Sequence, residues 1–166
     1  GYHQMMILPS QKRLFAFSAG RQHLQYVRVP MGARNSSASM QSLVELVFRG
    51  LPLEYILAYL DDIIIATPDE DSHLAMLEKV FDALFRANLK LHPGKCVFAN
   101  ASVLALGFLM DAEGIRPDPN NLKKIEDWPY PTSLTEVRSF LGLANYYRTH
   151  IPKYAAIAEP LTDLLR

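Results

Sequence analysis

Hydrophobic and polar residues alternate in short runs over the first thirty positions, as they do in strands that bury one face. Two of these runs, Leu14–Ala19 and Leu24–Val29, flank Gly20, and this arrangement predicts a β-hairpin. Pro30 and Gly32 then interrupt the strand pattern, so we expect the hairpin to end there.

A helical period follows this break. Apolar residues recur at spacings of three and four, which predicts a helix near residues 37–49 that buries one face. Ser36 or Ser37 is expected to cap its start, and Gly50 and Pro52 are expected to end it. The expected buried face consists of Met40, Leu43, Val44 and Val47.

The most apolar segment is residues 55–66, in which two short apolar runs meet at Asp61 and Asp62. This pattern predicts two antiparallel strands of a buried sheet, joined by an acidic turn. Thr67-Pro68-Asp69-Glu70 follows and has the form of a capping box with proline at the first helical position, so we expect a helix near residues 68–87. Its expected apolar face consists of Leu74, Leu77, Phe81, Leu84 and Phe85.

Three further helices are expected in the second half of the chain. Asp118-Pro119 can begin a short one. Ser133-Leu134-Thr135-Glu136 is a second capping box and begins a longer one. The last is expected from about Tyr154 to the end.

The order of these elements predicts the fold class. Strand character returns over Val103–Met110, and a proline-rich stretch from Pro117 to Pro131 then marks a change of architecture. We therefore predict an α+β fold, in which an antiparallel sheet backed by helices occupies residues 1–110 and a helical region occupies residues 111–166.

Composition narrows the class of protein. Nearly half of the 166 residues are apolar, which is enough to build a core. No apolar run approaches the ~18 residues of a membrane span, and nothing at the start resembles a signal peptide, so we expect an intracellular protein with no membrane partner. The single cysteine, Cys96, excludes an internal disulfide and argues against a structural zinc site.

The formal net charge is zero, but the charges are unevenly distributed. Residues 1–50 carry six basic side chains and one acidic one, whereas residues 51–110 carry four bases and eight acids. A basic segment followed by an acidic one suits a site where an anionic ligand meets cations held by carboxylates. Charge alone is equally typical of an ordinary surface.

Asp61 and Asp62 carry the strongest chemical signal. Adjacent carboxylates repel each other, and a bound divalent cation removes that conflict. Mg²⁺ takes carboxylate oxygens together with substrate phosphates, so two aspartates at a strand tip suit it. For the dipeptide alone a solvated turn is the ordinary interpretation. The apolar flanks favour a site, because such strands belong to a buried sheet that points both acids at one place.

The sequence Tyr59-Leu60-Asp61-Asp62 resembles the Tyr-X-Asp-Asp turn of reverse transcriptases. Further segments resemble gypsy-type retrotransposon enzymes of this family in the same order, including a lysine-bearing loop at Leu89–Cys96 and a primer-grip hairpin at Leu104–Gly107. The remaining matching segments are Gly1–Gln4, Pro30–Gln41, Gly114–Pro119 and Arg138–Arg148. The resemblance spans essentially the whole chain. It implies an RNA-directed DNA polymerase, with a partial palm over residues 1–110 and a thumb over residues 111–166.

The resemblance also implies roles for particular side chains. Asp61 and Asp62 would hold two Mg²⁺ ions, or Mn²⁺ in their place. Lys95 would donate a proton to pyrophosphate, and Tyr2 would exclude nucleotides that carry a 2′-hydroxyl. Further substrate contacts are expected at Gly32, Arg34, Gln41 and Tyr59. Tyr146, Tyr147 and Arg148 would either face the duplex or pack the thumb core.

The implied partners are dNTPs and an RNA or DNA template with its primer. The implied cellular locations are the cytoplasm, virus-like particles or the nucleus. The family's first metal-binding aspartate would lie four residues before Gly1. The fingers and ribonuclease H regions would likewise belong to a longer parent, so we expect the isolated chain to be incomplete and inactive.

Departures from the family pattern leave a second interpretation open. In the matching segment Pro30–Gln41, the family's usual Phe, Leu, Thr, Ala, Pro and Phe are replaced by Met31, Ala33, Arg34, Ser36, Ser37 and Met40. These changes are also expected of a non-catalytic relic kept as an interaction module with a palm–thumb fold. An RNA-copying RNA polymerase is a weaker third option, because the Tyr-Leu-Asp-Asp and thumb sequences argue against it.

Overall fold

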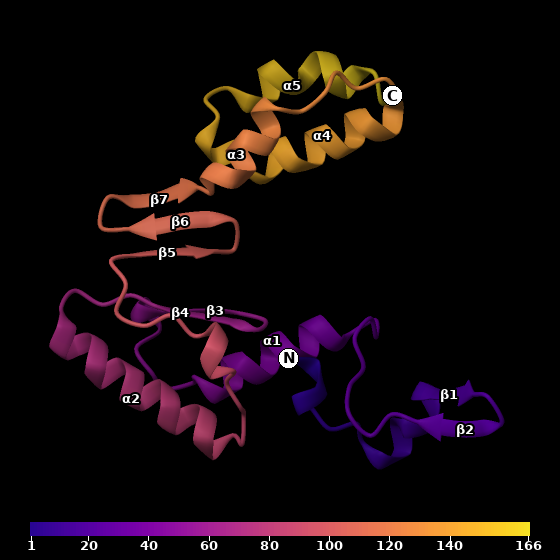
Figure 1. Ribbon diagram of the computed structural model, residues 1–166, viewed down its shortest axis with the longest axis vertical. Helices are drawn as coiled ribbons and strands as arrows, with labels where there is room; N and C mark the ends of the chain where they lie inside the picture. The colour runs from indigo at the N-terminus through magenta and orange to yellow at the C-terminus, as the bar shows by residue number, and fades with distance from the viewer. The chain divides into compact units, whose positions relative to one another are not determined.

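The computed structural model describes residues 1–166, which form two compact units, Gly1–Cys96 and Val97–Arg166 (Figure 1). The predicted α+β class is confirmed, because short antiparallel sheets alternate with helices in the chain. The strands form two separate hairpins and one three-stranded sheet. The division into compact units falls after Cys96. The boundary between palm and thumb, expected near residue 110, is a separate expectation from the family resemblance, and it stays a prediction.

The first unit contains two hairpins and two long helices. The first hairpin forms around Gly20 as predicted, and this glycine adopts a left-handed φ of +59° in its turn. Residues 2–4 and 9–15 form 3₁₀ turns rather than further strands. The regular elements are β1 (Ala16–Ala19), β2 (Gln22–Gln25), α1 (Ser36–Val47), β3 (Ile56–Tyr59), β4 (Asp62–Ile65) and α2 (Glu70–Arg86).

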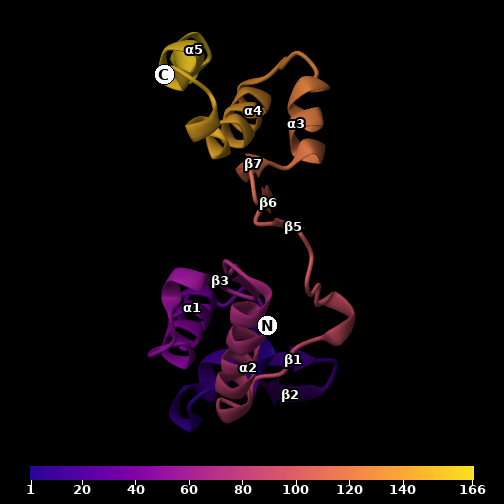
Figure 2. The same ribbon diagram turned by 90° about the vertical axis from the view of Figure 1, so that its left-hand side faces the viewer.

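Helices α1 and α2 share one apolar core with the β3–β4 hairpin, and Figure 2 shows β3 beside both helices. The predicted face of α1 is confirmed, since Met40 and Val44 are buried while Leu43 and Val47 are half-buried. The buried residues of this core are Met40, Val44, Phe48, Ile56, Met76, Val80 and Leu84.

The predicted face of α2 is wrong in part. The helix buries Met76, Val80 and Leu84, of which only Leu84 was expected. Phe85 is 79% exposed. Apolar residues lie on two adjacent faces of this helix, and the helical period alone cannot tell which face meets α1 and the hairpin.

Two of the predicted helix caps are also wrong. Asn35 precedes α1 without a side-chain cap, and the hydroxyl of Ser36 donates instead to the carbonyl oxygen of Ala33 at 2.7 Å. Helix α2 begins two residues later than expected, because Asp69 rather than Thr67 accepts the amide of Ser72. Aspartate caps a helix at least as well as threonine does. The sequence therefore allowed a start at Glu70, with Asp69 as the cap, as readily as the earlier start at Pro68.

The second unit contains a three-stranded antiparallel sheet and three helices. The third strand was not predicted, since residues 114–117 mix a glycine, a proline and an arginine. The caps of α3 by Asp118 and of α4 by Ser133 are confirmed. The elements are β5 (Ser102–Ala105), β6 (Phe108–Asp111), β7 (Gly114–Pro117), α3 (Pro119–Glu126), α4 (Leu134–Tyr146) and α5 (Tyr154–Asp163). None of the helices is long and apolar enough to span a membrane.

The helix caps predict how stability depends on pH. The amide of Ser72 lowers the pKa of Asp69 from its ordinary value of 3.8, and the amide of Thr132 lowers the pKa of Glu136 from 4.5. Because both folded-state pKa values lie below the unfolded ones, this stabilisation is fully present above about pH 4.5 and is lost as the pH falls through the folded-state values. Urea unfolding between pH 6 and pH 3 measures the loss.

Asp69→Asn tests the origin of this dependence. Asparagine caps a helix as well as aspartate but does not titrate, so the variant should lose less stability on acidification than the wild type. Asp127→Asn is the matched control, because Asp127 is exposed and its side chain caps no helix. This variant should leave the dependence of stability on pH unchanged. Equal acid sensitivity of Asp69→Asn and the wild type would contradict the assignment.

Candidate active site

Asp61 and Asp62 lie at the tip of the β3–β4 hairpin, as the sequence predicts. The strands pair Tyr59 with Asp62, so Leu60 and Asp61 form a two-residue turn. Leu60 adopts a left-handed φ of 54°, which is uncommon for a residue with a side chain. The side chain of Asp61 is 49% exposed and Asp62 is exposed, so both carboxylates can reach a ligand from solvent.

The side-chain amide of Gln41 holds this turn from α1. Its Oε1 accepts the amide of Leu60 at 2.9 Å, and its Nε2 donates to the carbonyl oxygen of Ala58 at 3.1 Å. Nε2 also contacts Oε1 of Glu45 at 3.0 Å. Gln41 therefore holds the backbone of the turn that carries the two aspartates, a role that the sequence analysis missed when it expected only a substrate contact at Gln41.

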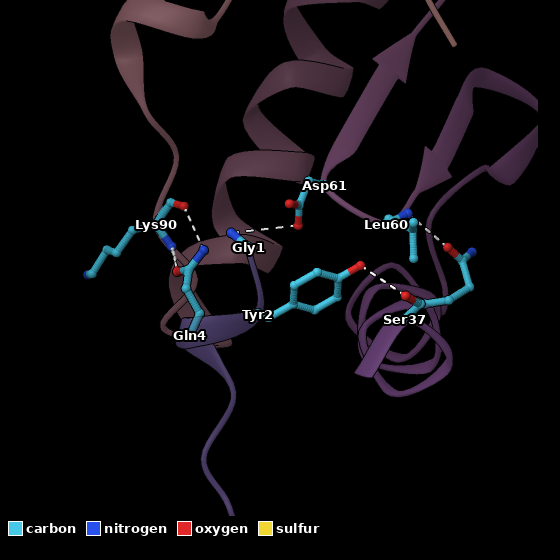
Figure 3. A network of polar contacts seen from close by, with 8 residues as sticks. Gly1, Tyr2, Gln4, Ser37, Leu60, Asp61 and Lys90 are labelled. Carbon is cyan, nitrogen blue, oxygen red and sulfur yellow. Dashed lines mark hydrogen bonds and ion pairs between the residues drawn. The ribbon is translucent and has the colours of Figure 1, made fainter. Parts of the chain in front are cut away.

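The N-terminal turn brings Gly1 and Tyr2 to the same place (Figure 3). The nitrogen of Gly1 lies 3.6 Å from Oδ1 of Asp61, and a Cβ added at Gly1 would lie 2.9 Å from Oδ2. The hydroxyl of Tyr2 shares a hydrogen bond of 3.0 Å with the hydroxyl of Ser37. The ring of Tyr2 also packs against the core, so both ends of this side chain are fixed.

Gln4 joins the N-terminal turn to the segment that carries Lys95. Its side chain donates to the carbonyl oxygen of Lys90 and accepts the amide of the same residue, across 86 positions of sequence (Figure 3). Arg28 donates to the carbonyl oxygen of Gln4 at 2.8 Å. No sequence pattern pointed to Gln4, because its contact depends on the tertiary structure.

The remaining predicted residues form no hydrogen bond or ion pair with the side chains of the aspartates. Gly32 has a φ of +83°, and a Cβ at this position would meet nothing within 4 Å, so the glycine is required by its backbone angle rather than by lack of space. Arg34 is exposed in the loop before α1 and forms no ion pair. Lys95 is exposed on a 3₁₀ turn, Pro93–Lys95, and forms no side-chain bond to Asp61 or Asp62.

The donor set fits a hard cation bound through two carboxylates. Nowhere in residues 1–166 do three His, Cys, Asp or Glu side chains gather closely enough to enclose a metal. Mg²⁺ commonly binds through one or two carboxylates and completes its octahedron with water and substrate phosphates. The exposed Asp61–Asp62 pair meets that requirement and leaves the other positions open.

Comparison with known proteins agrees with the motifs. The family described as "Reverse transcriptase (RNA-dependent DNA polymerase)" matches residues 1–110. The retrovirus-related Pol polyprotein from transposon 297 of Drosophila melanogaster is 40% identical over all 166 residues, which cover 16% of that polyprotein. The corresponding polyprotein from transposon gypsy is 36% identical over the same residues. The chain thus spans about a sixth of the length of these curated relatives.

Solved structures of a viral enzyme share the fold. The foamy viral protease–reverse transcriptase in complex with an RNA/DNA hybrid has a TM-score of 0.88 and 29% identity, over 99% of this chain and 22% of that one. The same enzyme in complex with double-stranded DNA has a TM-score of 0.84 and 30% identity, over 96% of this chain and 33% of that one.

Loss of the Gln41 side chain should destabilise the fold. Gln41→Ala leaves the amide of Leu60 and the carbonyl oxygen of Ala58 without their partner, at a cost of about 1–3 kcal/mol in the free energy of unfolding. Urea unfolding measures this difference. Gln25→Ala, at an exposed strand position, is the control and should change stability by about 0.5 kcal/mol or less. Equal stability of the two variants would remove Gln41 from this role.

Proposed function

The chain belongs to the reverse transcriptase family, and on that premise we propose that residues 1–166 supply the palm and thumb parts of an RNA-directed DNA polymerase encoded by a retrotransposon. The observation that carries the proposal is the exposed Asp61–Asp62 pair on a turn whose backbone is held by Gln41. Polymerase substrates are polyanions, and a fixed carboxylate pair is the means of recruiting the cations that bind their phosphates.

Within this proposal the carboxylates of Asp61 and Asp62 help to hold two Mg²⁺ ions. Two ions held there would supply the chemistry that lowers the pKa of a primer 3′-hydroxyl and stabilises a leaving pyrophosphate. The chain's own contribution is orientation: Gln41 holds the backbone that carries both carboxylates before substrate arrives, so less reorganisation would be needed during the reaction. A third carboxylate, four residues before Gly1 in the parent polypeptide, would complete the set.

The neighbouring side chains fit the roles of substrate contacts. Tyr2 is fixed between the core and Ser37, and a fixed ring beside Asp61 can exclude a 2′-hydroxyl and so favour dNTPs. Tyr59, which immediately precedes the turn, is 54% exposed. Arg34 is free to bind phosphate, and Gly32 allows the loop before α1 to adopt its left-handed angle. Lys95 is proposed as the proton donor to pyrophosphate.

The proposed partners are dNTPs and a template with its primer. The matched foamy viral enzymes are described in complexes with DNA and with an RNA/DNA hybrid, which supports nucleic acid as the ligand of this chain as well. The fingers and ribonuclease H regions of the parent polyprotein are proposed to complete the enzyme.

The decisive test uses a chimera. The parent is a Drosophila Pol polyprotein that extends a primer on an RNA template, and residues 1–166 replace its matching segment. The 40% identity to the transposon 297 polyprotein over this segment favours a compatible fold. We predict dNTP-dependent extension by the chimera and none by the isolated chain with Mg²⁺ or Mn²⁺, since two carboxylates alone do not fix both ions. If the chimera folds but is inactive while its parent is active, the chain is better interpreted as a non-catalytic relic. Robust extension by the isolated chain would contradict the argument that its metal site is incomplete.

Asp61→Asn in the chimera should lower the extension rate by about 10²-fold or more, because it removes a charge that faces the metals. Asp82→Asn is the control, since Asp82 is an exposed aspartate on α2 that forms a surface ion pair with Arg86. Single-turnover extension with saturating dNTP measures the rate. Similar rates for the two variants would show that Asp61 is not a metal ligand.

Arg34→Ala in the chimera should raise the KM for dNTP several-fold with little change in kcat, if Arg34 contacts the triphosphate in both ground and transition states. Arg21→Ala, at an exposed hairpin turn, is the control. Steady-state extension on a homopolymer template separates the two constants. An unchanged KM would leave Arg34 as an ordinary surface residue.

A further inference from the structure

The side chain of Tyr2 is anchored at its far end by a residue of α1. Its hydroxyl shares a hydrogen bond of 3.0 Å with the hydroxyl of Ser37, across 35 positions of sequence (Figure 3). The ring of Tyr2 is half-buried and packs against the apolar core, which contacts only part of its surface. The bond to Ser37 adds a directional contact that limits how far the ring can tilt.

The start of α1 holds Ser37 in place. Ser36, the first residue of this helix, is buried, and its hydroxyl donates to the carbonyl oxygen of Ala33 at 2.7 Å. Met40, one turn further along the helix, is buried in the core. Because the backbone is held on both sides of Ser37, and because one torsion angle places a serine oxygen, this hydroxyl has few positions available.

The backbone of Tyr2 is held separately. Residues 2–4 form a 3₁₀ turn, in which the amide of Met5 donates to the carbonyl oxygen of Tyr2 at 3.0 Å. Gln4 ties this turn to Lys90 by two hydrogen bonds. These contacts fix where the side chain of Tyr2 begins but leave its torsion angles free. The orientation of the ring is therefore decided by the core packing and by the bond to α1.

The residue before this ring lies against the candidate metal ligands. A Cβ added at Gly1 would lie 2.9 Å from Oδ2 of Asp61, and Figure 3 shows the ring of Tyr2 extending from the same turn toward Ser37. Leu60, the other residue of the aspartate turn, packs against the same core as Tyr2. All of these residues belong to the first compact unit. A change in the angle of the ring therefore changes the space available beside the carboxylates.

Ser37 is one of the positions at which this chain departs from the family pattern, which has proline there. Proline carries no side-chain donor or acceptor, so it could not bind the hydroxyl of Tyr2. The first turn of a helix accepts proline as well as serine, so the hydroxyl of Ser37 is not needed to begin α1. Its distinct contribution in this structure is the contact with Tyr2.

We propose that Ser37 is a positioning residue that holds the ring of Tyr2 at the angle that excludes a 2′-hydroxyl. The inference rests on the proposed polymerase function, in which this ring lies under the sugar of the incoming nucleotide. Discrimination against a ribonucleotide requires a clash that the ring cannot relieve by moving aside. A ring held by packing alone can tilt, whereas the hydroxyl bond opposes the tilt. Ser37 thus sets the degree of discrimination between dNTP and rNTP through Tyr2.

The first experiment tests the contact itself in the 166-residue chain by carbon NMR of labelled tyrosine. Ser37→Ala removes only the hydroxyl and should shift the Cζ resonance of Tyr2, which reports hydrogen bonding of the phenolic oxygen. Ser37→Thr keeps a hydroxyl and should retain most of the wild-type shift. Ser39→Ala is the matched control, since Ser39 is an exposed serine of the same helix, and it should leave the resonance unchanged. An unchanged resonance in Ser37→Ala would overturn the proposal.

The second experiment measures selectivity with the active chimera. Single-nucleotide incorporation gives kcat/KM for a dNTP and for the matching rNTP, and the ratio of the two measures discrimination. Ser37→Ala should lower this ratio about fivefold or more, whereas Ser37→Thr and Ser39→Ala should stay within about twofold of wild type. Because both substrates are measured on one preparation, a loss of folded protein cancels in the ratio. A merely structural role of Ser37 would therefore leave the ratio unchanged.

Tyr2→Ala removes the ring and separates the ways in which the proposal can fail. If Tyr2→Ala lowers the ratio and Ser37→Ala does not, the ring excludes the 2′-hydroxyl without Ser37, and the inference is overturned while the proposed function stands. If neither variant lowers the ratio, the role proposed for Tyr2 is wrong as well. A chimera that incorporates no dNTP would refute the proposed function, while the resonance of Tyr2 still decides whether Ser37 holds the ring.

Discussion

The geometry of the candidate site depends on one side-chain amide. The two-residue turn that carries Asp61 and precedes Asp62 is strained by the left-handed angle of Leu60. Gln41 offsets this by satisfying the amide of Leu60 and the carbonyl oxygen of Ala58 at once. Because Gln41 lies one residue beyond the buried Met40, the core that fixes α1 also fixes the turn.

The same core explains why distant segments meet at Asp61. Tyr2 packs against the cluster formed by α1, α2 and β3, which draws the N-terminal turn beside the hairpin. A Cβ at Gly1 would lie 2.9 Å from Oδ2 of Asp61, so a side chain at this position would shift the exposed carboxylate. Packing therefore brings the segments together, and small residues and polar contacts decide how closely they approach.

Sequence reasoning found the elements whose signal is local. The Asp61–Asp62 turn and the face of α1 followed from short apolar runs and a helical period. It failed where several local solutions are equivalent, as for the face of α2 and its cap at Asp69. It could not find Gln4, Ser37 or the contacts of Tyr147, because each depends on a partner that is between 26 and 86 positions away. Such pairs are determined by tertiary structure, so a single sequence does not reveal them.

The two units use the same physical device at different turns. In each, a hairpin turn with a left-handed first residue has its backbone bound by a polar side chain from a helix, Gln41 at Leu60 and Tyr146 at Leu106. Apolar packing tolerates small sliding movements, whereas a hydrogen bond loses strength when its distance or angle changes. A turn held in this way keeps its position while the surrounding surface stays exposed. That combination is what a site needs if it must be open to a large polyanionic ligand and still present its reacting groups at fixed positions.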